Sequence, residues 1–390
     1  MPSEQPAAQE SKKLRIAVMA RGLSVPVGGV RRYIEQMVRR LPLVDPESTY
    51  GIFHNSERHV GTFSMGEEVY HPTRNTWWWE NAWFPSAVKR WKADVVFCPK
   101  NLVPFGLPSS VRVVTCLLDM AYFPVRGSYL AEYKFLDVAY MRLALPHSLA
   151  RSDHLVCISD HTRADVHELF DVPAKRMSTV LLGVEQPAED ALTEEKLKEV
   201  RQAYNLYQPY VFYAGSLSPR KNISRLVRAL ASIADQVPHQ LVVTAGKSWK
   251  DRAVFEAVES SGFQDRFVQL GAVPDEDMPA LYRMADVFTF PSLFEGFGLP
   301  VLEAMACGCP VLTSSTTSLP EAAGDSAVLI DPIDEQAIAH TLLRMLTDEE
   351  ERSTWRERGL RRAVEMNWNR TARGLVDVFH QVVSDQGPQT

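Results

Sequence analysis

Short runs of β-branched and aromatic residues alternate with longer helical patterns along the first half of the chain. The runs are LRIAVM (14–19), YGIF (50–53), DVVF (94–97), VRVVTCLL (111–118) and LVCI (155–158). Short apolar runs are typical of buried strands, and strands that alternate with helical segments are typical of parallel sheets. The pattern therefore predicts a parallel sheet that is covered by helices on both faces.

A second series of runs follows a polar, acidic segment at residues 185–200, which we interpret as the linker region. Its runs are YVFYAG (210–215), QLVVTAG (240–246), RFVQLG (266–271), DVFTFP (286–291), CPVLTSS (309–315) and AVLI (327–330). The chain is therefore predicted to be α/β, with two Rossmann-like domains at residues 13–190 and 191–366 that face one another across a cleft. Ligands of such open sheets bind at the carboxyl ends of the strands.

The two ends of the chain have different patterns. Residues 1–12 are polar and are predicted to be disordered. Residues 352–384 return to a helical pattern that breaks around Asn367 and Trp368, which predicts a C-terminal helix over residues 367–390. The N-terminus lacks the apolar core of a signal peptide, and no run reaches about 18 apolar residues. Neither secretion by a visible signal nor a membrane span is therefore predicted.

The composition limits the partners and the compartment. Of the 390 residues 45% are hydrophobic, which suits two domains, and 42 Lys and Arg against 48 Asp and Glu give a net charge of −6. No global positive field therefore favours nucleic acid as a partner. Most of the five cysteines lie in apolar runs and are predicted to be reduced and buried, as in a cytosolic protein. Cys307 and Cys309 have no second cysteine or histidine pair nearby, so packing is favoured over a metal site.

The first candidate site is a glycine pair, Gly28 and Gly29, just before a predicted helix. That helix is indicated by apolar residues spaced three or four apart, namely Val30, Tyr33, Ile34, Met37, Val38 and Leu41. Glycines at a helix start let the backbone approach a ligand, and the free N–H groups there suit a phosphate. A plain strand-to-helix turn is the alternative, because neither G-x-G-x-x-G nor a Walker lysine is present.

The second candidate is the basic pair Arg220 and Lys221, which lies between the run YVFYAG and a predicted helix with Asn222 as its N-cap. The apolar face of that helix consists of Ile223, Leu226, Val227 and Leu230. Two cations and free N–H groups at a strand end suit a diphosphate, because their positive charge stabilises a negative leaving group. A solvated basic turn is the alternative.

The third candidate is the segment EGFGLPVLEAMACGCPV (295–311), in which two glutamates flank a glycine-rich turn. A proline and a later glycine bracket a short helix predicted over residues 300–307. Glu303 is then expected in the first turn, and Glu295 on the loop before it. Both carboxylates can accept hydrogen bonds from paired sugar hydroxyls, and the glycines let backbone N–H groups touch the same ligand. Taken singly, either glutamate is also compatible with a surface or helix-start position.

With these three segments the chain resembles the family-4 glycosyltransferases, which are retaining enzymes of the GT-B fold. The resemblance runs over nearly the whole chain and is most specific in GSLSPRKN (215–222), LYRMADVFTFPSLFEGFGLPVLEAMACGCPV (281–311) and SLPEAAGDSA (318–327). Looser matches are WWWENAWFP (77–85), DVVFCPKNLVPF (94–105) and CISDHTRADV (157–166). The resemblance implies that the first domain binds the acceptor, that the second binds the nucleotide-sugar donor, and that the C-terminal helix crosses back to the first domain.

The resemblance also implies roles for the candidate residues. Arg220 and Lys221 would bind the donor diphosphate. Glu295 would contact hydroxyls of the donor sugar, and Glu303 would hold the ribose. Further residues expected to contact the donor, mainly through the backbone, are Gly28, Gly29, Gly215, Gly246, Val273, Phe297, Gly298 and Leu299.

One position departs from the family pattern. Relatives often carry His-Asp-Leu after the strand that corresponds to VRVVTC, whereas this chain has Leu118, Asp119 and Met120. The missing histidine puts a direct side-chain role at that position in doubt. Asp119 stays a catalytic candidate at the strand end, where it either orients a sugar hydroxyl or caps the following turn.

The resemblance implies a metal-independent transfer without a cofactor. The acceptor attacks the face that the leaving phosphate departs from, so the anomeric configuration is retained, and the phosphate takes the acceptor proton. The predicted donor is GDP-mannose, on resemblance to bacterial enzymes of surface-polysaccharide synthesis. The predicted acceptor is a saccharide or a lipid-linked saccharide, and the predicted location is the cytoplasm.

The segment TWWWENAWFPSAVKRWK (76–92) combines five tryptophans with basic residues. Such a mixture suits a surface on which sugars stack, or the interface of an anionic membrane that carries a lipid-linked acceptor. Peripheral contact with the inner face of the cytoplasmic membrane is therefore one hypothesis. The alternative is a helix that packs its aromatic residues into the first domain.

Other classes of protein remain as rivals at this stage. A sugar-nucleotide epimerase or a phosphorylase shares the GT-B fold, but the former lacks the combination of SPRKN and paired glutamates, and the latter needs the context of a cofactor-binding lysine. A two-domain sugar-nucleotide-binding protein without activity is a third alternative. Intact Arg220, Lys221, Glu295 and Glu303 argue against it.

Overall fold

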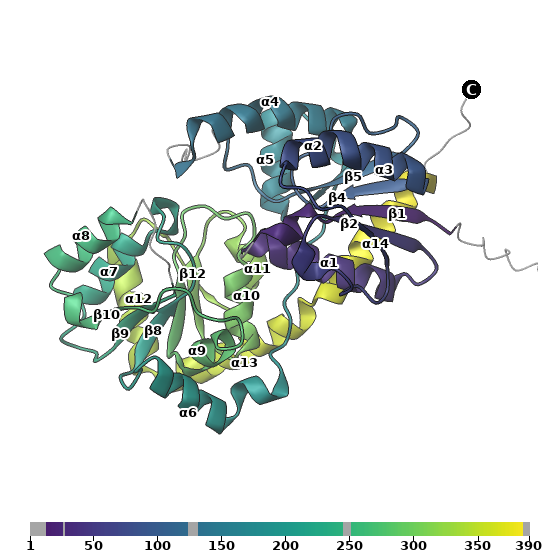
Figure 1. Cartoon of the computed structure of the whole chain (residues 1–390). Helices are drawn as coiled ribbons and strands as arrows, with labels where there is room; N and C mark the ends of the chain where they lie inside the picture. The colour runs from purple at the N-terminus through teal and green to yellow at the C-terminus, as the bar shows by residue number, and fades with distance from the viewer. Residues whose placement is uncertain (1–12, 26–27, 124–131, 245–250, 385–390) are drawn as a thin grey trace, which may run out of the picture. The chain divides into compact units, whose positions relative to one another are not determined.

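The computed structural model describes residues 13–25, 28–123, 132–244 and 251–384, which form two parallel sheets with helices (Figure 1). The predicted α/β class with two Rossmann-like sheets is confirmed. The predicted disorder of residues 1–12 lies outside the described residues.

The first sheet has seven strands among the described residues, in the order β3-β2-β1-β4-β5-β6-β7. They are β1 (Arg15–Met19), β2 (Thr49–His54), β3 (Glu67–Tyr70), β4 (Val95–Cys98), β5 (Arg112–Leu117), β6 (His154–Cys157) and β7 (Met177–Thr179). The pairings of β1 with β2 and β4, of β2 with β3 and of β4 with β5 are parallel. All five predicted strands are present. The edge strands β3 and β7 were not predicted, because they are short and lack a continuous apolar run.

The second sheet has six strands within the described ranges, in the order β10-β9-β8-β11-β12-β13, and every neighbouring pair is parallel. They are β8 (Tyr210–Tyr213), β9 (Gln240–Val243), β10 (Phe267–Gln269), β11 (Val287–Phe290), β12 (Val311–Ser314) and β13 (Val328–Ile330). Each corresponds to one predicted apolar run. The sequence pattern therefore identified all strands of this sheet.

Helices connect the strands of both sheets. They are α1 (Gly29–Val44), α2 (Thr76–Trp78), α3 (Phe84–Trp91), α4 (Phe135–Arg151), α5 (Asp160–Phe170), α6 (Glu194–Ala203), α7 (Ile223–Ala231), α8 (Arg252–Ser260), α9 (Met278–Met284), α10 (Leu299–Ala306), α11 (Leu319–Ala323), α12 (Glu335–Thr347), α13 (Glu349–Glu365) and α14 (Trp368–Ser384). On one side of the second sheet α7 contacts α8 and α12, and on the other side α10 contacts α9, α11 and α13 (Figure 1). The second sheet is therefore covered on both faces, as predicted.

Internal contacts divide the chain into two compact units. The first unit comprises residues 1–116, 147–155 and 372–390, and the second comprises residues 117–146 and 156–371. Most of α14 belongs to the first unit, where Phe379 packs against Phe97 with ring centroids 5.3 Å apart. The prediction that the C-terminal helix crosses back to the first domain is thus confirmed. The acidic segment that we interpreted as the linker region contributes to α6, which Lys196 ties to Asp277 at 2.8 Å.

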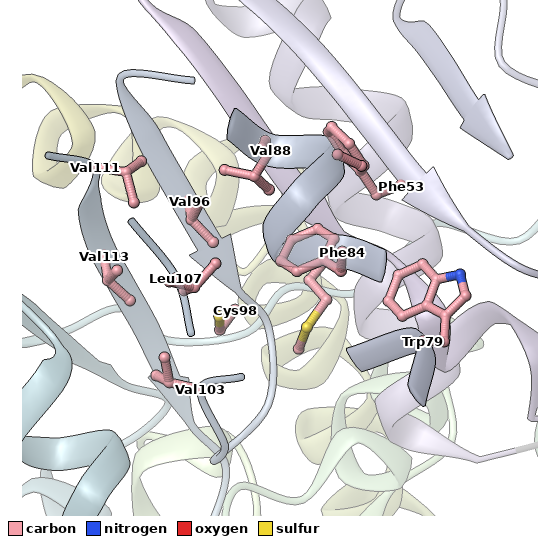
Figure 2. Packing of buried hydrophobic residues seen from close by; sticks show 13 residues of the cluster. Phe53, Trp79, Phe84, Val88, Val96, Cys98, Val103, Leu107, Val111 and Val113 are labelled. Atoms are coloured by element: carbon pink, nitrogen blue, oxygen red, sulfur yellow. The ribbon is translucent and has the colours of Figure 1, made fainter. Parts of the chain in front are cut away.

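Aromatic residues form much of the core of the first unit (Figure 2). The fully buried Trp79 stacks on Phe84 with ring centroids 5.4 Å apart, and the edge of Phe84 meets Phe53 at 5.3 Å. Trp83 and Trp91 pack against the same cluster. The packing alternative therefore holds for these three tryptophans, whereas Trp77 and Trp78 remain exposed.

The predicted helical faces are largely buried. All four apolar residues of α7 are buried, and so are five of the six predicted for α1. Val30 is the exception: it is 38% exposed, because it lies in the first turn of α1. All five cysteines are buried, as predicted, and none is joined in a disulfide. No helix in the described part of the chain is both long and apolar enough to span a bilayer.

Candidate active site

The candidate residues of the second unit meet where the strand order of its sheet reverses. In this sheet β9, the next strand along the chain, lies on one side of β8, and β11 lies on its other side. The strands β8 and β11 pair in register at Val211 and Val287. Arg220 and Lys221 lie in η7 (Pro219–Lys221) after β8, and Glu295 lies on the loop after β11. Such a switch point is where open α/β sheets bind ligands.

Asn222 holds the loop after β8 against the end of β11. Its side-chain amide donates hydrogen bonds to the carbonyl oxygens of Pro291 at 3.0 Å and Pro332 at 2.7 Å. Asn222 is in the predicted N-cap position of α7, but its backbone is left-handed, with a φ of 64°, and its side chain makes no capping hydrogen bond. Asparagine tolerates this conformation. Its side-chain amide ties the loop that carries Arg220 and Lys221 to the segments after β11 and β13.

Glu295 is paired with both cations. Its carboxylate accepts a hydrogen bond from Lys221, and one from Arg220 at 3.2 Å. Arg220 also donates to the Phe294 carbonyl at 3.0 Å, and the Lys221 ammonium lies 4.8 Å from the centroid of the Phe290 ring. Burial would raise the pKa of Glu295, but Lys221 and Arg220 hold it below its usual value. Two cations and one ionised carboxylate therefore share a largely buried site.

A second carboxylate contacts Arg220 from a part of the chain that carries no motif. Glu132 accepts a hydrogen bond from the backbone N–H of Arg220 at 2.5 Å and lies 3.5 Å from its Nε. This contact joins residues 88 positions apart in sequence. A single glutamate in a segment without periodicity gives no signal for such a contact, so sequence reasoning missed Glu132.

Asp119 lies in the same unit as Arg220, Lys221 and Glu295, and each of these charges influences its ionisation. A close approach of two backbones holds it there, because Gly296 packs against the Leu118 carbonyl group and the Asp119 Cβ. The Ser159 hydroxyl also donates to the Gly296 carbonyl at 2.9 Å. Asp119 Oδ1 accepts a hydrogen bond from the Ala121 N–H at 3.1 Å. Asp119 therefore caps the turn that follows it, which was the alternative to a role at a sugar hydroxyl. The structure therefore combines that cap with a position beside the charged site.

Replacing Asp119 with asparagine is expected to raise the Tm at neutral pH by about 1–3 °C. Burial raises the pKa of Asp119, although the Ala121 N–H and Arg220 oppose this effect. The ionised carboxylate is thus less favourable in the folded than in the unfolded protein. This cost is complete above the raised pKa and vanishes below the unfolded value of about 3.9, so the gain should shrink as the pH falls through the raised pKa toward the unfolded value. Thermal unfolding followed by circular dichroism at several pH values tests this, and a gain that grows toward acid pH contradicts it.

Glu303 lies on α10, close to its predicted position. The helix begins at Leu299, one residue earlier than predicted, and Glu303 is its fifth residue rather than a residue of the first turn. Its carboxylate accepts a hydrogen bond from the buried Tyr282 hydroxyl at 3.1 Å. Gly298 has a φ of 110° at the N-cap, which glycine adopts without strain. The buried Phe297 and Leu299 flank it.

The remaining predicted residues are spread over both units. Gly28 is the N-cap of α1 with a φ of 124°, and Gly29 is the first residue of that helix, in the first unit. Gly215 has a φ of 146° after β8, and Val273 lies on the loop after β10. Gly246 lies outside the described residues. In the described part of the chain, no three His, Cys, Asp or Glu side chains cluster as metal ligands do.

Comparison with known proteins identifies the family. The family model described as Glycosyl transferases group 1 matches residues 196–362. Residues 196–362 therefore form a Glycosyl transferases group 1 domain. The matched range contains Arg220, Lys221, Glu295 and Glu303, whereas Asp119 and Glu132 lie outside it.

Relatives of the chain include mannosyltransferases of Escherichia coli. The chain is 29% identical to the O-antigen chain mannosyltransferase B over 94% of its own length and 99% of that protein. It is 30% identical to the serotype-specific mannosyltransferase WbdA over 74% of its own length and 35% of that longer protein.

The fold is shared with solved glycosyltransferases. A crystal structure of a glycosyltransferase from Rickettsia africae matches with a TM-score of 0.74 at 15% identity, over 96% of this chain and 100% of that one. The GT-B fold expected from the sequence is therefore confirmed.

Proposed function

We propose that this glycosyltransferase moves a mannosyl group from GDP-mannose to a saccharide or lipid-linked saccharide acceptor during synthesis of a surface polysaccharide. The observation that carries the proposal is the set of Arg220, Lys221 and Glu295 at the switch point of the second sheet. A buried lysine beside a partly buried arginine suits a diphosphate, and a carboxylate between them suits sugar hydroxyls. The mannosyltransferases among the relatives support mannose as the sugar.

The proposed reaction breaks the bond between the anomeric carbon and the β-phosphate oxygen and forms a bond to the acceptor oxygen. The acceptor proton passes to the leaving phosphate, so the products are GDP and the glycosylated acceptor. Attack on the face from which the phosphate departs retains the anomeric configuration. Arg220 and Lys221 stabilise the charge that develops on the diphosphate, so the proposed transfer needs no metal ion.

The remaining residues complete the proposed donor site. Glu303 is assigned to the ribose, and Asp119 to a sugar hydroxyl. Gly28 and Gly29 are assigned to the diphosphate, and the loop that carries Val273 to the base. We place the reaction in the cytoplasm, at a lipid-linked acceptor on the inner face of the membrane.

A nucleotide screen with a turnover assay tests the proposal. Thermal-shift measurements with GDP-mannose, UDP-glucose, ADP-glucose and dTDP-glucose are expected to give the largest rise in Tm with GDP-mannose, because only a ligand of the folded state stabilises it. Release of GDP should depend on an α-mannoside acceptor and persist in EDTA, and the product should carry an α-linkage. A Tm shift without GDP release would indicate the inactive binding protein. Interconversion of a UDP-sugar without acceptor would indicate the epimerase.

Replacing Glu132 with alanine is expected to tighten GDP binding about 10-fold. The Glu132 carboxylate occupies the Arg220 N–H and lies beside its guanidinium, where a phosphate oxygen of the donor is proposed to bind. Removal of this competing anion raises the population of binding-competent protein. Isothermal titration with GDP measures the effect.

Glu335→Ala is the matched control for the Glu132 variant. It removes the same charge from the same unit, but Glu335 pairs with Arg228 on the surface, 2.8 Å away. GDP affinity should stay unchanged in this control. Weaker GDP binding by the Glu132 variant would mean that Glu132 orients Arg220 instead of competing with the diphosphate.

A further inference from the structure

The first sheet has its own switch point, which carries two cations. β1 and β4 are parallel neighbours, with Val18 paired to Phe97, yet the chain passes from β1 to β2 on the other side. Arg21 follows the end of β1 by two residues, and Lys100 follows the end of β4 by two. Both side chains therefore extend from the carboxyl ends of adjacent central strands, where such sheets bind ligands.

One carboxylate lies between these cations. Glu80 Oε1 accepts hydrogen bonds from Arg21 Nε at 2.5 Å and Lys100 Nζ at 3.0 Å, and the three side chains are 15–23% exposed. Burial would raise the pKa of Glu80, but Lys100 and Arg21 hold it below its usual value. The cluster therefore has a net charge of +1. A guanidinium and an ammonium carry eight N–H donors, far more than one carboxylate oxygen can accept, so the cluster retains donors for a ligand.

The position of Glu80 is fixed by the core beneath it. It lies in η3 (Trp79–Trp83), a π-helical turn, directly after Trp79. The Trp79 ring is wholly buried among the apolar residues of the first unit (Figure 2). π-Helical turns are rare and occur frequently at functional sites.

Two exposed aromatic rings accompany the ionic cluster. Trp77, three residues before Glu80, is 62% exposed, and Phe105 is 40% exposed. Asn81 joins their backbones, because its amide donates to the Trp77 carbonyl at 3.0 Å and accepts the Phe105 N–H at 2.8 Å. The segments that carry Glu80 and Lys100 therefore also carry exposed rings, and rings combined with a few fixed polar groups are the composition of a site for a small polar ligand.

We propose that Trp77, Phe105 and the Arg21–Glu80–Lys100 cluster form a subsite for the acceptor saccharide. The rings contact the apolar C–H face of a pyranose. Arg21 and Lys100 donate hydrogen bonds to its hydroxyls, and Glu80 Oε2 accepts one. This inference rests on the proposed function, because a transferase needs a site for its second substrate apart from the donor site.

Saturation-transfer NMR with methyl α-mannopyranoside and α-mannotriose tests the subsite in the full chain. The wild type is expected to give a signal, and Trp77→Ala and Lys100→Ala are expected to weaken binding about 10-fold, or 1.4 kcal/mol. Trp78→Ala is the matched control, since the neighbouring Trp78 packs on His71, with ring centroids 5.3 Å apart. This control should bind as the wild type does.

GDP titration of the same variants separates this inference from the proposed function. GDP should bind the Trp77 and Lys100 variants with wild-type affinity, which also shows that they are folded. Failure of the wild type to bind GDP would overturn the proposed function itself. If the wild type binds GDP but no mannoside, the subsite is wrong and the proposed function stands. The same conclusion follows if the mannoside signal survives Trp77→Ala and Lys100→Ala but is lost in Lys221→Ala.

Discussion

The Lys221→Ala variant is expected to transfer mannose with a kcat about 10²–10³ lower than the wild type, and with a smaller change in donor KM. The Lys221 ammonium is buried at the switch point of the second sheet and is oriented by Glu295 and the Phe290 ring. In the proposed reaction, negative charge grows on the departing diphosphate. A fixed cation stabilises this charge more in the transition state than in the bound donor, so its loss lowers turnover more than affinity. Initial rates of GDP release over a range of GDP-mannose concentrations measure both constants.

A structural explanation of the Lys221 effect can be separated by a double variant. Removing Lys221 leaves the partly buried Glu295 with Arg220 as its remaining cationic partner, which lowers stability as well as activity. Lys221→Ala combined with Glu295→Gln should recover Tm but not kcat. Lys196→Ala removes a lysine paired with Asp277 in the same unit and should leave kcat unchanged. A kcat within threefold of wild type in Lys221→Ala would remove the lysine from the proposed mechanism.

Replacing Gly296 with alanine is expected to lower kcat about 100-fold. An added methyl group would overlap the Leu118 carbonyl oxygen and would lie 3.0 Å from the Asp119 Cβ. Because the neighbouring atoms belong to the backbone, the loop after β11 must move. That movement would separate Asp119 from Glu295 and Arg220, and a shift of about 1 Å in an active site is enough for a loss of this size.

Gly262→Ala is the control for the Gly296 variant. Gly262 has a φ of 69°, and a methyl group there would meet nothing within 4 Å. Alanine at this position costs about 1 kcal/mol of backbone strain without a change at the site. Both variants should be assayed well below their Tm, with the folded fraction followed by circular dichroism. A Gly296→Ala enzyme with wild-type kcat would show that this close approach does not set the active geometry.

The sequence by itself determined eleven of the thirteen described strands, the two-sheet α/β class and the convergence of Arg220, Lys221 and Glu295. Apolar periodicity is a local property, and it places each strand that carries a continuous apolar run, whereas the short edge strands β3 and β7 carry none. Because the carboxyl ends of parallel strands share one edge, residues that follow β8 and β11 meet once those strands are neighbours. The convergence of these three residues could therefore be predicted from motif and order along the chain.

Only the tertiary structure decided which distant groups complete these sites. Glu132 reaches Arg220 from 88 residues away, and Gly296 holds Asp119 in the second unit through a backbone contact. Asn222 is in its predicted N-cap position, but its side chain bonds to the carbonyls of Pro291 and Pro332 instead of capping the helix. The ion pairs of Glu80 likewise depend on β1 and β4 being neighbours. Contacts of this kind depend on side-chain direction and strand order, which local periodicity does not encode.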